Sequence, residues 1–489
     1  MMKGVCMMRK PNIIYLLADD WGYGDVSCLN PDSKIPTPHT DQLASEGMIF
    51  ADAHSNSAVC TPTRYGVMTG RYCWRSRLKR GVLNGYSEPL IEDGRMTVPS
   101  LLRDEGYTTA CVGKWHLGLG WQVRDGAERV NGETVDFSAP LTDGPHTVGF
   151  DYSFIIPASL DMAPYCYIED GVVVEQPVEE TADSPRPEFW RGGACAPGFM
   201  HDTCLLELTI RAEGFINQHA KENGDKPFFL YFPAPSPHTP HFARGRFAGR
   251  SQAGEYGDYV TEHDWSVGRI LSAVKRNGLG DDTLIIVTSD NGCHEEPIGL
   301  KEKYDHLGNY IYRGQKSDAW DGGHRIPFIA SWPGVIEPGS RCDKTVCLTD
   351  LLATVAGICD VELPGDAGED SYDILPYMRG DQEDTIREAT VHHSISGEFA
   401  IRKDQWKLVT CRGSGGWSLR EADVPEDAPP MQLYDMVSDP EEQYNLFLEK
   451  SEVAEELLGI LDRYREGDRS VERGTTGRSP DQFTEKCEG

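Results

Sequence analysis

Short apolar runs alternate with amphipathic segments along most of this chain. Four apolar runs predict buried strands, at residues 12–18, 108–113, 227–233 and 283–289. Apolar residues at helical spacing predict helices at 38–47, 62–69, 99–105, 203–221 and 256–277. This alternation is typical of an α/β fold, so we expect a large, mostly parallel sheet flanked by helices.

Two regions depart from this pattern. Residues 120–197 are rich in Gly, Pro and acidic side chains, which predicts long loops over one edge of the sheet. Beyond about residue 380, short apolar runs at 399–402 and 406–411 predict antiparallel strands, and 451–465 predicts an amphipathic closing helix. We therefore divide the chain into an α/β domain, 1–380, and a smaller antiparallel-sheet and helix domain, 381–489, whose last twenty or so residues are expected to be loose.

Charge and hydropathy exclude several classes of protein. The chain has 78 acidic and 47 basic residues and a net charge of −31, which argues against nucleic-acid and membrane-surface partners. No apolar run approaches the roughly 20 residues of a membrane span. The run at 13–18 passes directly into Asp19 without a cleavage site, so it predicts a strand rather than a secretion signal. We expect a cytoplasmic protein, or a periplasmic or secreted one if a signal segment precedes the given start.

Polar side chains follow each of the four predicted strands. They are Asp19 and Asp20, Lys114 and His116, His238, and Asp290 and Asn291. In open α/β sheets ligands bind outside the carboxyl ends of the strands, so we expect these groups to meet at one rim. The acidic and amide side chains offer only oxygen ligands, which suits a hard cation. Either pair alone favours an ordinary strand-end turn or loop start, but the two together favour a cation site.

The segment Cys60-Thr-Pro-Thr-Arg64 predicts the start of a helix. Pro62 fits the first turn, Gly70 can end the helix, and Arg64 returns to the face of Cys60 one turn later. A sulfur at a helix N-terminus beside a guanidinium is a candidate reactive site. Taken alone, these five residues fit a buried Cys with a surface Arg better than they fit a reactive site.

The wider sequence resembles the type I, formylglycine-dependent sulfatases. The segment from Cys60 to Arg71, CTPTRYGVMTGR, resembles their signature. Further landmarks follow in the family's order over roughly residues 10–340: ADDWGYGD at 18–25, GKWHLG at 113–118, SPH at 236–238, SDNG at 289–292, and GQK at 314–316 through the glycine pair 322–323. The set is similar to the branch of arylsulfatase A and N-acetylgalactosamine-6-sulfatase in the alkaline phosphatase superfamily.

The resemblance implies a sulfuric ester hydrolase with an alkaline phosphatase-like fold. In this family a maturation enzyme oxidises the Cys, here Cys60, to formylglycine. One hydroxyl of the hydrated aldehyde attacks sulfur, and the other allows sulfate to be released. The family usually carries calcium, which the resemblance assigns to residue 60 together with Asp19, Asp20, Asp290 and Asn291.

The resemblance also implies roles for individual side chains. Lys114 and Lys316 would bind sulfate, His116 would orient the diol, and His238 would donate a proton to the leaving alcohol. Arg64 would fix the formylglycine and the nearby carboxylates. Contacts to substrate are expected from Asp161, His241, His324 and Arg325. The expected substrate is a small O-sulfated saccharide of the galactose or N-acetylgalactosamine type.

Two other functions stay open at this point. Relatives in the same superfamily hydrolyse phosphonate or phosphate esters on a similar metal site, and comparison of kcat/KM on paired sulfate and phosphate esters separates these activities. An unmatured chain could instead bind sulfated glycans without hydrolysing them. The intact motif set favours the sulfatase.

Overall fold

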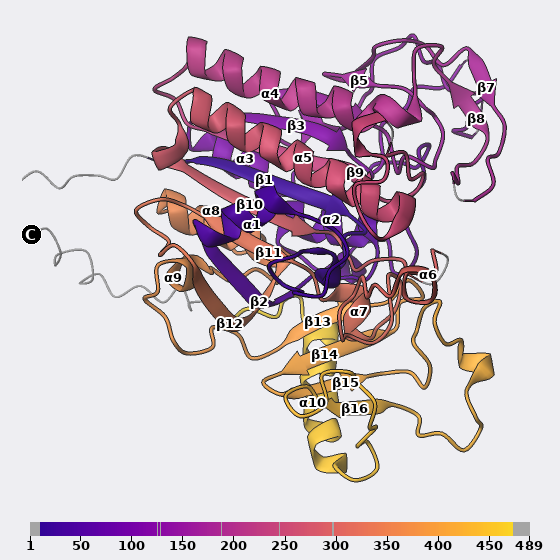
Figure 1. The fold of residues 1–489 in the computed structure, drawn as a ribbon, viewed down its shortest axis with the longest axis vertical. Coiled ribbons are helices and arrows are strands. Elements are labelled where there is room, and N and C mark those ends of the chain that lie inside the picture. Colours follow the sequence, from indigo (N-terminus) through magenta and orange to yellow (C-terminus); the bar gives the residue numbers. More distant parts are fainter. Residues whose placement is uncertain are drawn as a thin grey trace, which may run out of the picture.

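A ten-stranded sheet forms the centre of the protein. The computed structural model describes residues 10–472 except 125, 128, 187, 244, 296 and 297. The strands of this sheet are arranged in the order β12-β2-β11-β10-β1-β9-β3-β4-β5-β6 (Figure 1). The strands are β1 (Asn12–Asp19), β2 (Met48–His54), β3 (Thr108–Lys114), β4 (Tyr152–Ile156), β5 (Ile168–Glu169), β6 (Val172–Val173), β9 (Phe228–Pro237), β10 (Thr283–Ser289), β11 (Phe328–Ser331) and β12 (Ser340–Cys347). Neighbours among β10, β1, β9, β3 and β4 pair in parallel, which confirms the predicted fold class.

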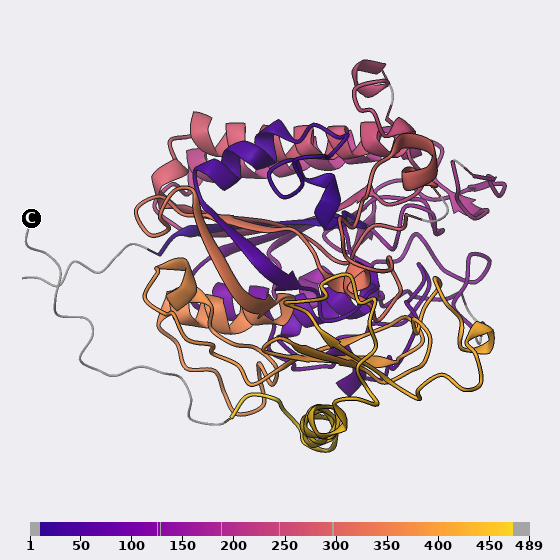
Figure 2. The same cartoon turned by 60° about the horizontal axis from the view of Figure 1, so that its bottom comes forward.

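Helices cover both faces of this sheet (Figure 2). One face carries α1 (Pro38–Ser45), α4 (Cys204–Glu222) and α5 (Gly254–Arg276), and the other carries α2 (Cys60–Thr69), α3 (Val98–Asp104) and α8 (Leu351–Cys359). Shorter helices are α6 (Leu300–Tyr304), α7 (Asp321–His324) and α9 (Leu375–Met378). Within the described ranges, no helix combines the length and apolar character that a bilayer span requires.

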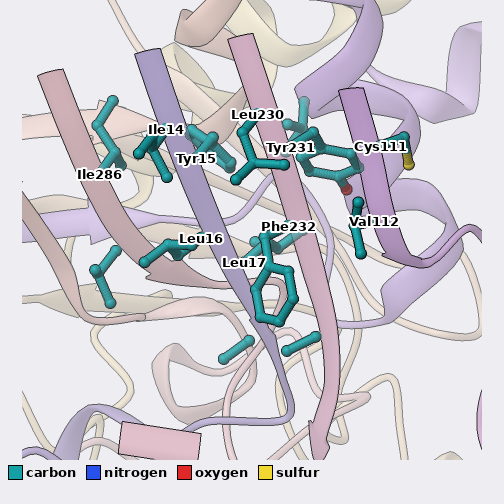
Figure 3. Packing of buried hydrophobic residues seen from close by; sticks show 14 of the residues in the cluster. Ile14, Tyr15, Leu16, Leu17, Cys111, Val112, Leu230, Tyr231, Phe232 and Ile286 are labelled. Atoms are coloured by element: carbon teal, nitrogen blue, oxygen red, sulfur yellow. The ribbon is translucent and has the colours of Figure 1, made fainter. Parts of the chain in front are cut away.

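The central strands are buried on both faces, which explains their continuous apolar runs. Successive side chains of β1, from Ile14 to Leu17, are at most 1% exposed. They pack beside Leu230 and Phe232 of β9 and Ile286 of β10 (Figure 3). The four strands and five helices expected in this part of the chain are confirmed, with ends displaced by up to four residues, as at β9, which continues to Pro237.

The expectation that residues 120–197 form only loops is wrong. This region contains β4, which pairs in parallel with β3, and the short strands β5 and β6 that extend the sheet beyond it. It also contains a small hairpin of β7 (Glu179–Thr181) and β8 (Gly193–Cys195). The apolar run of β4 is only Phe154 to Ile156, too short to stand out among the surrounding Gly, Pro and acidic residues.

The C-terminal region forms a separate antiparallel sheet, as predicted. Its strands are β13 (Thr390–His393), β14 (Phe399–Lys403), β15 (Trp406–Val409) and β16 (Gln432–Asp435), and α10 (Ser451–Glu466) packs on it. All strands of the large sheet precede residue 380 and all four of these follow it, although the division at 380 itself stays a prediction. Residues 473–489, in the segment expected to be loose, lie outside the described residues.

The small sheet contacts the segments that carry Cys60 and Lys316. The backbone N–H of Ala58 donates to the carbonyl of His393 at 3.0 Å. The N–H of Ser317 donates to the carbonyl of Ala58 at 2.8 Å, and the carbonyl of Ser317 accepts from Ile395 at 3.0 Å. Two of these backbone hydrogen bonds join the small-sheet region to the two segments, and the third joins the segments to each other.

One buried acid on α5 should make stability depend on pH. Glu262 is 6% exposed, and its Oε2 has no hydrogen-bond partner among the described residues. Burial raises the pKa of Glu262 from 4.5 to about 8; Arg246 opposes this shift and Asp202 adds to it. Between these pH values the native chain keeps a proton that the unfolded chain releases, so stability falls as pH rises through this window.

We expect Glu262→Gln to remove this part of the pH dependence. At pH 8 the variant should have a higher Tm than the parent chain, and at pH 4.5 or below the two should unfold together. Thermal unfolding at both pH values measures the difference. Glu255→Gln, an exposed position at the start of α5, is the matched control and should follow the parent at both. Equal Tm values for Glu262→Gln and the parent at pH 8 would contradict the prediction.

Candidate active site

Polar side chains gather at the carboxyl ends of the four neighbouring strands β10, β1, β9 and β3. Asp19 ends β1, Lys114 ends β3, His238 follows β9, and Asp290 follows β10. All four side chains are buried, the most exposed being His238 at 8%. The structure thus brings the groups expected from these strands to one rim, where they can act on a single ligand.

Cys60 is the first residue of α2 and lies against this rim. Every residue of α2 is buried, and Gly70, in the left-handed region at φ 63°, ends the helix as expected. The Cys60 Sγ and carboxylate oxygens of Asp19 and Asp290 all lie within 4.8 Å of one another. Burial raises the pKa of the Cys60 thiol, although Lys114 and Lys316 oppose the shift. Burial therefore opposes ionisation of the unmodified thiol, while the two lysines favour it.

Arg64 is fully buried beneath the rim, so it is not the surface residue that its local sequence also allowed. Its Nε and Nη2 donate to Oδ2 of Asp290 at 3.1 and 2.6 Å, and its Nη1 donates to the carbonyl of Lys114 at 3.2 Å. Nη2 is also 3.5 Å from Oδ1 of Asp19. One guanidinium therefore ties α2 to the ends of β1, β3 and β10.

Two buried lysines face the carboxylates. Lys114 Nζ donates to Oδ2 of Asp19 at 2.7 Å and to the hydroxyl of Ser159 at 3.2 Å. Lys316 Nζ donates to Oδ2 of Asp20 at 2.8 Å. Burial alone would raise the pKa of Asp19, but the charges of Lys114 and its neighbours lower it below its usual range. These pairs place two ammonium groups at the rim.

Ser159 is a site residue that sequence reasoning missed. Its hydroxyl contacts Lys114 and lies 3.3 and 3.4 Å from the two ring nitrogens of His238. Ser159 follows β4 by three residues, so the signal that revealed the other groups, a polar side chain after a buried strand, applies here too. It was lost because β4 itself was not predicted.

The two histidines each have one nitrogen fixed by a backbone carbonyl. His238 Nδ1 donates to the carbonyl of Thr239 at 2.7 Å, which leaves Nε2 toward Asp20, 3.7 Å from Oδ2. His116 Nε2 donates to the carbonyl of Leu83 at 2.8 Å, and Nδ1 has no partner in the described part of the chain. Burial and the charge of Lys114 hold the pKa of His116 well below 6.5, so its Nδ1 is a free acceptor.

His116 reaches the site from a turn beyond the end of β3. β3 ends at Lys114, and His116 has a left-handed backbone with φ 55°. Side-chain alternation therefore does not extend from Lys114 to His116. The turn, rather than strand pleating, positions the ring.

The oxygen atoms at the rim fit a divalent cation. Oδ1 of Asp19 and Oδ1 of Asn291 are buried and have no hydrogen-bond partner among the described residues. Burial raises the pKa of Asp290 to about 7. The charge of Arg64 opposes this shift, and the neighbouring charge of Asp19 adds to it. Unpartnered oxygens and mutually repelling carboxylates are what a hard cation would satisfy. The donor set of Asp19, Asp20, Asp290 and Asn291 therefore suits calcium.

Of the four expected substrate contacts, two lie beside the rim. His241 is 7% exposed, and burial followed by the charge of His238 lowers its pKa to about 3. Asp161 is 3% exposed, two residues beyond Ser159, and forms an ion pair with Arg191. Their contact with substrate stays a prediction.

The structure does not bring His324 and Arg325 to this rim. His324 Nδ1 lies 2.9 Å from His54 Nδ1, and its ring stacks on His392 of the small sheet at 4.0 Å. Arg325 forms ion pairs with Asp52 and Asp321. His324 thus joins β2 to the small sheet, and Arg325 joins β2 to α7, so neither lies with the groups expected to contact substrate.

Comparison with known proteins identifies the class. The family model described as Sulfatase matches residues 11–361. The chain belongs to this family and is a sulfuric ester hydrolase.

Individual relatives support this assignment over nearly the whole chain. N-acetylgalactosamine-6-O-sulfatase of Bacteroides thetaiotaomicron is 34% identical, with 93% of each chain covered. Human arylsulfatase A is 30% identical, covering 94% of this chain and 87% of its own. A structure solved in work on glycosaminoglycan metabolism by Bacteroides thetaiotaomicron has a TM-score of 0.80 at 33% identity, covering 94% of this chain and 100% of the other.

Arg64 should be essential to stability because it compensates buried carboxylates. We expect Arg64→Leu to destabilise the fold by about 3 kcal/mol or more, since it leaves Asp290 buried without its partner. Urea unfolding measures this loss. Arg341→Leu is the matched control: its ion pair with Asp343 has side chains 57% and 73% exposed, so little change is expected. Similar midpoints for the two variants would refute the compensating role.

Proposed function

We propose that the chain hydrolyses an O-sulfated carbohydrate through a formylglycine made from Cys60, with 6-O-sulfated N-acetylgalactosamine as the first substrate to test. The observation that carries the proposal is the approach of the Cys60 Sγ to carboxylate oxygens of Asp19 and Asp290 within 4.8 Å. The sugar is suggested by the N-acetylgalactosamine-6-O-sulfatase relative. A small saccharide fits the buried position of these groups.

Lys114 and Lys316 are suited to bind the sulfate group. Their ammonium groups are already held at the rim by Asp19 and Asp20, at 2.7 and 2.8 Å. A sulfate ester spreads its negative charge over several oxygens, so cations fixed in a buried site stabilise the charge that develops on them. Because these cations are ordered before substrate arrives, little reorganisation is needed.

The histidines are suited to move protons. His238 has Nδ1 occupied by the carbonyl of Thr239, so Nε2 is the nitrogen that can donate to the leaving alcohol oxygen. His116 has Nε2 occupied by the carbonyl of Leu83, so Nδ1 can accept a proton from a hydroxyl on residue 60. When formed, a hydrated formylglycine supplies the hydroxyl nucleophile and the second hydroxyl that a thiol lacks.

Conversion of Cys60 requires a partner enzyme. Cys60 is 3% exposed and the whole of α2 is buried, so the folded chain offers little access to the thiol. We therefore infer that the formylglycine-generating maturation enzyme acts on this segment before it folds.

The mass of the Cys60 tryptic peptide and matched variants test the nucleophile. In protein from a host with a competent maturation system, the peptide should be lighter by about 18 Da, whereas the competing oxidations of Cys make it heavier. Cys60→Ala should lose hydrolysis of 6-sulfated N-acetylgalactosamine, and Cys73→Ala, another buried Cys, should keep it. The parent should also have a higher kcat/KM on an aryl sulfate than on the matching phosphate. An unmodified thiol, or full turnover by Cys60→Ala, would overturn the assignment.

Asp19, Asp20, Asp290, Asn291 and residue 60 would hold calcium. When bound, the ion would supply positive charge that polarises a sulfate oxygen and favours ionisation of a hydroxyl. The Oδ1 atoms of Asp19 and Asn291, which accept no hydrogen bond within the described residues, support this placement.

Thermal unfolding tests the calcium site without measuring activity. Adding calcium to chelator-treated protein should raise the Tm progressively with calcium concentration, because the ion binds the native state. Asn291→Leu should reduce this rise, since it removes an oxygen ligand. Asp343→Asn, which removes an exposed carboxylate remote from the rim, should leave it unchanged. A Tm that does not respond to calcium in the parent would contradict the site.

A further inference from the structure

The loop between β15 and β16 presents an exposed tryptophan. Trp417 is 42% exposed and is the most exposed tryptophan in the described ranges. Tryptophan combines a large apolar face with a polar N–H and is enriched at binding surfaces. The neighbours of this side chain indicate which ligand it can bind.

The loop is fixed directly to the segment that carries Lys316. The backbone N–H of Trp417 donates to the hydroxyl of Ser317 at 3.0 Å and to Oδ1 of Asp318 at 2.9 Å. A Cβ at Gly416 would lie 2.4 Å from the carbonyl oxygen of Ser317, so glycine is required for this close approach. Trp417 is therefore held by the two residues that follow a sulfate-binding lysine.

The indole lies against His294, which belongs to the rim of the active site. The two rings are 4.7 Å apart between centroids, at 43°. His294 follows Cys293, whose carbonyl accepts the N–H of Lys316 at 3.0 Å. Burial lowers the pKa of His294 to about 3, and the charges of Lys316 and His238 also act on its ring. A neutral imidazole and an indole thus form one continuous wall beside the groups that bind sulfate.

We propose that Trp417 and His294 form a sugar-binding subsite for the saccharide part of the substrate. This deepens, and rests on, the proposed function. A pyranose has an apolar C–H face and a polar rim, so its face fits the indole while a hydroxyl can bond to the imidazole, which offers both a donor and an acceptor. An apolar aromatic face beside a fixed polar group is a combination typical of small-molecule recognition. The small sheet thereby contributes a wall of the active site.

Steady-state kinetics with two ligands tests the subsite. Trp417→Ala should raise KM for 6-sulfated N-acetylgalactosamine about tenfold, because the stacking surface is lost. The inhibition constant of inorganic sulfate should not change, because Lys114 and Lys316 are untouched. Trp417→Phe, which keeps an aromatic face, should recover most of the loss. Tyr444→Ala is the matched control, since Tyr444 is another exposed aromatic of the C-terminal region, 69% exposed.

Two results would overturn the subsite. An unchanged KM for Trp417→Ala would exclude contact with the sugar. A parallel loss of sulfate inhibition would mean that the loop only supports Lys316.

If the parent chain hydrolyses no sulfated sugar, the proposed function fails. The subsite is then tested separately by measuring binding of the sulfated sugar. The sulfated sugar should then still quench the indole fluorescence of the parent more than that of Trp417→Phe. Equal quenching in the two proteins would overturn the subsite.

Discussion

The pairing of buried charges at the carboxyl ends of β1 and β10 constrains the rest of this protein. Asp19 and Asp290 are fully buried, and an uncompensated buried carboxylate costs several kcal/mol. Arg64 compensates Asp290 and Lys114 compensates Asp19. Because Arg64 lies one turn after Cys60 on α2, docking the guanidinium on Asp290 also brings the start of this helix to the rim. The position of Cys60 thus follows from an ion pair.

The same constraint extends to distant parts of the chain. Asp20 is compensated by Lys316, 296 residues away. The segment after Lys316 is in turn bonded to Ala58, next to the Cys60 helix, and to Ile395 at the end of β13. Hydrogen bonds thus connect the small sheet and the Lys316 segment to the helix that begins at Cys60.

The sequence predicts what depends on local pattern and misses what depends on distant partners. Strands such as β1 and β10 are predictable because burial on both faces demands an unbroken apolar run, and α2 is marked by Pro62 and its terminal Gly. β4 is too short to give such a run, and Ser159 was lost with it. His324 lies close to Lys316 in sequence, yet its partners are His54 and His392, which no local pattern reveals.

The small sheet is fixed to the segment that carries Lys316 by buried ion pairs as well as by hydrogen bonds. Its residue Lys407 is fully buried and forms ion pairs with Asp321, in the helix beyond Lys316, and with Glu442. Buried pairs of this kind add little net stability but strongly disfavour arrangements in which one partner is displaced. These ion pairs therefore restrict the position of the segment that carries Lys316. The loop that carries Trp417 forms hydrogen bonds with the same segment. A boundary near residue 380 separates two sheets in sequence, but in space the small sheet and its loop are bonded to the segment that carries Lys316.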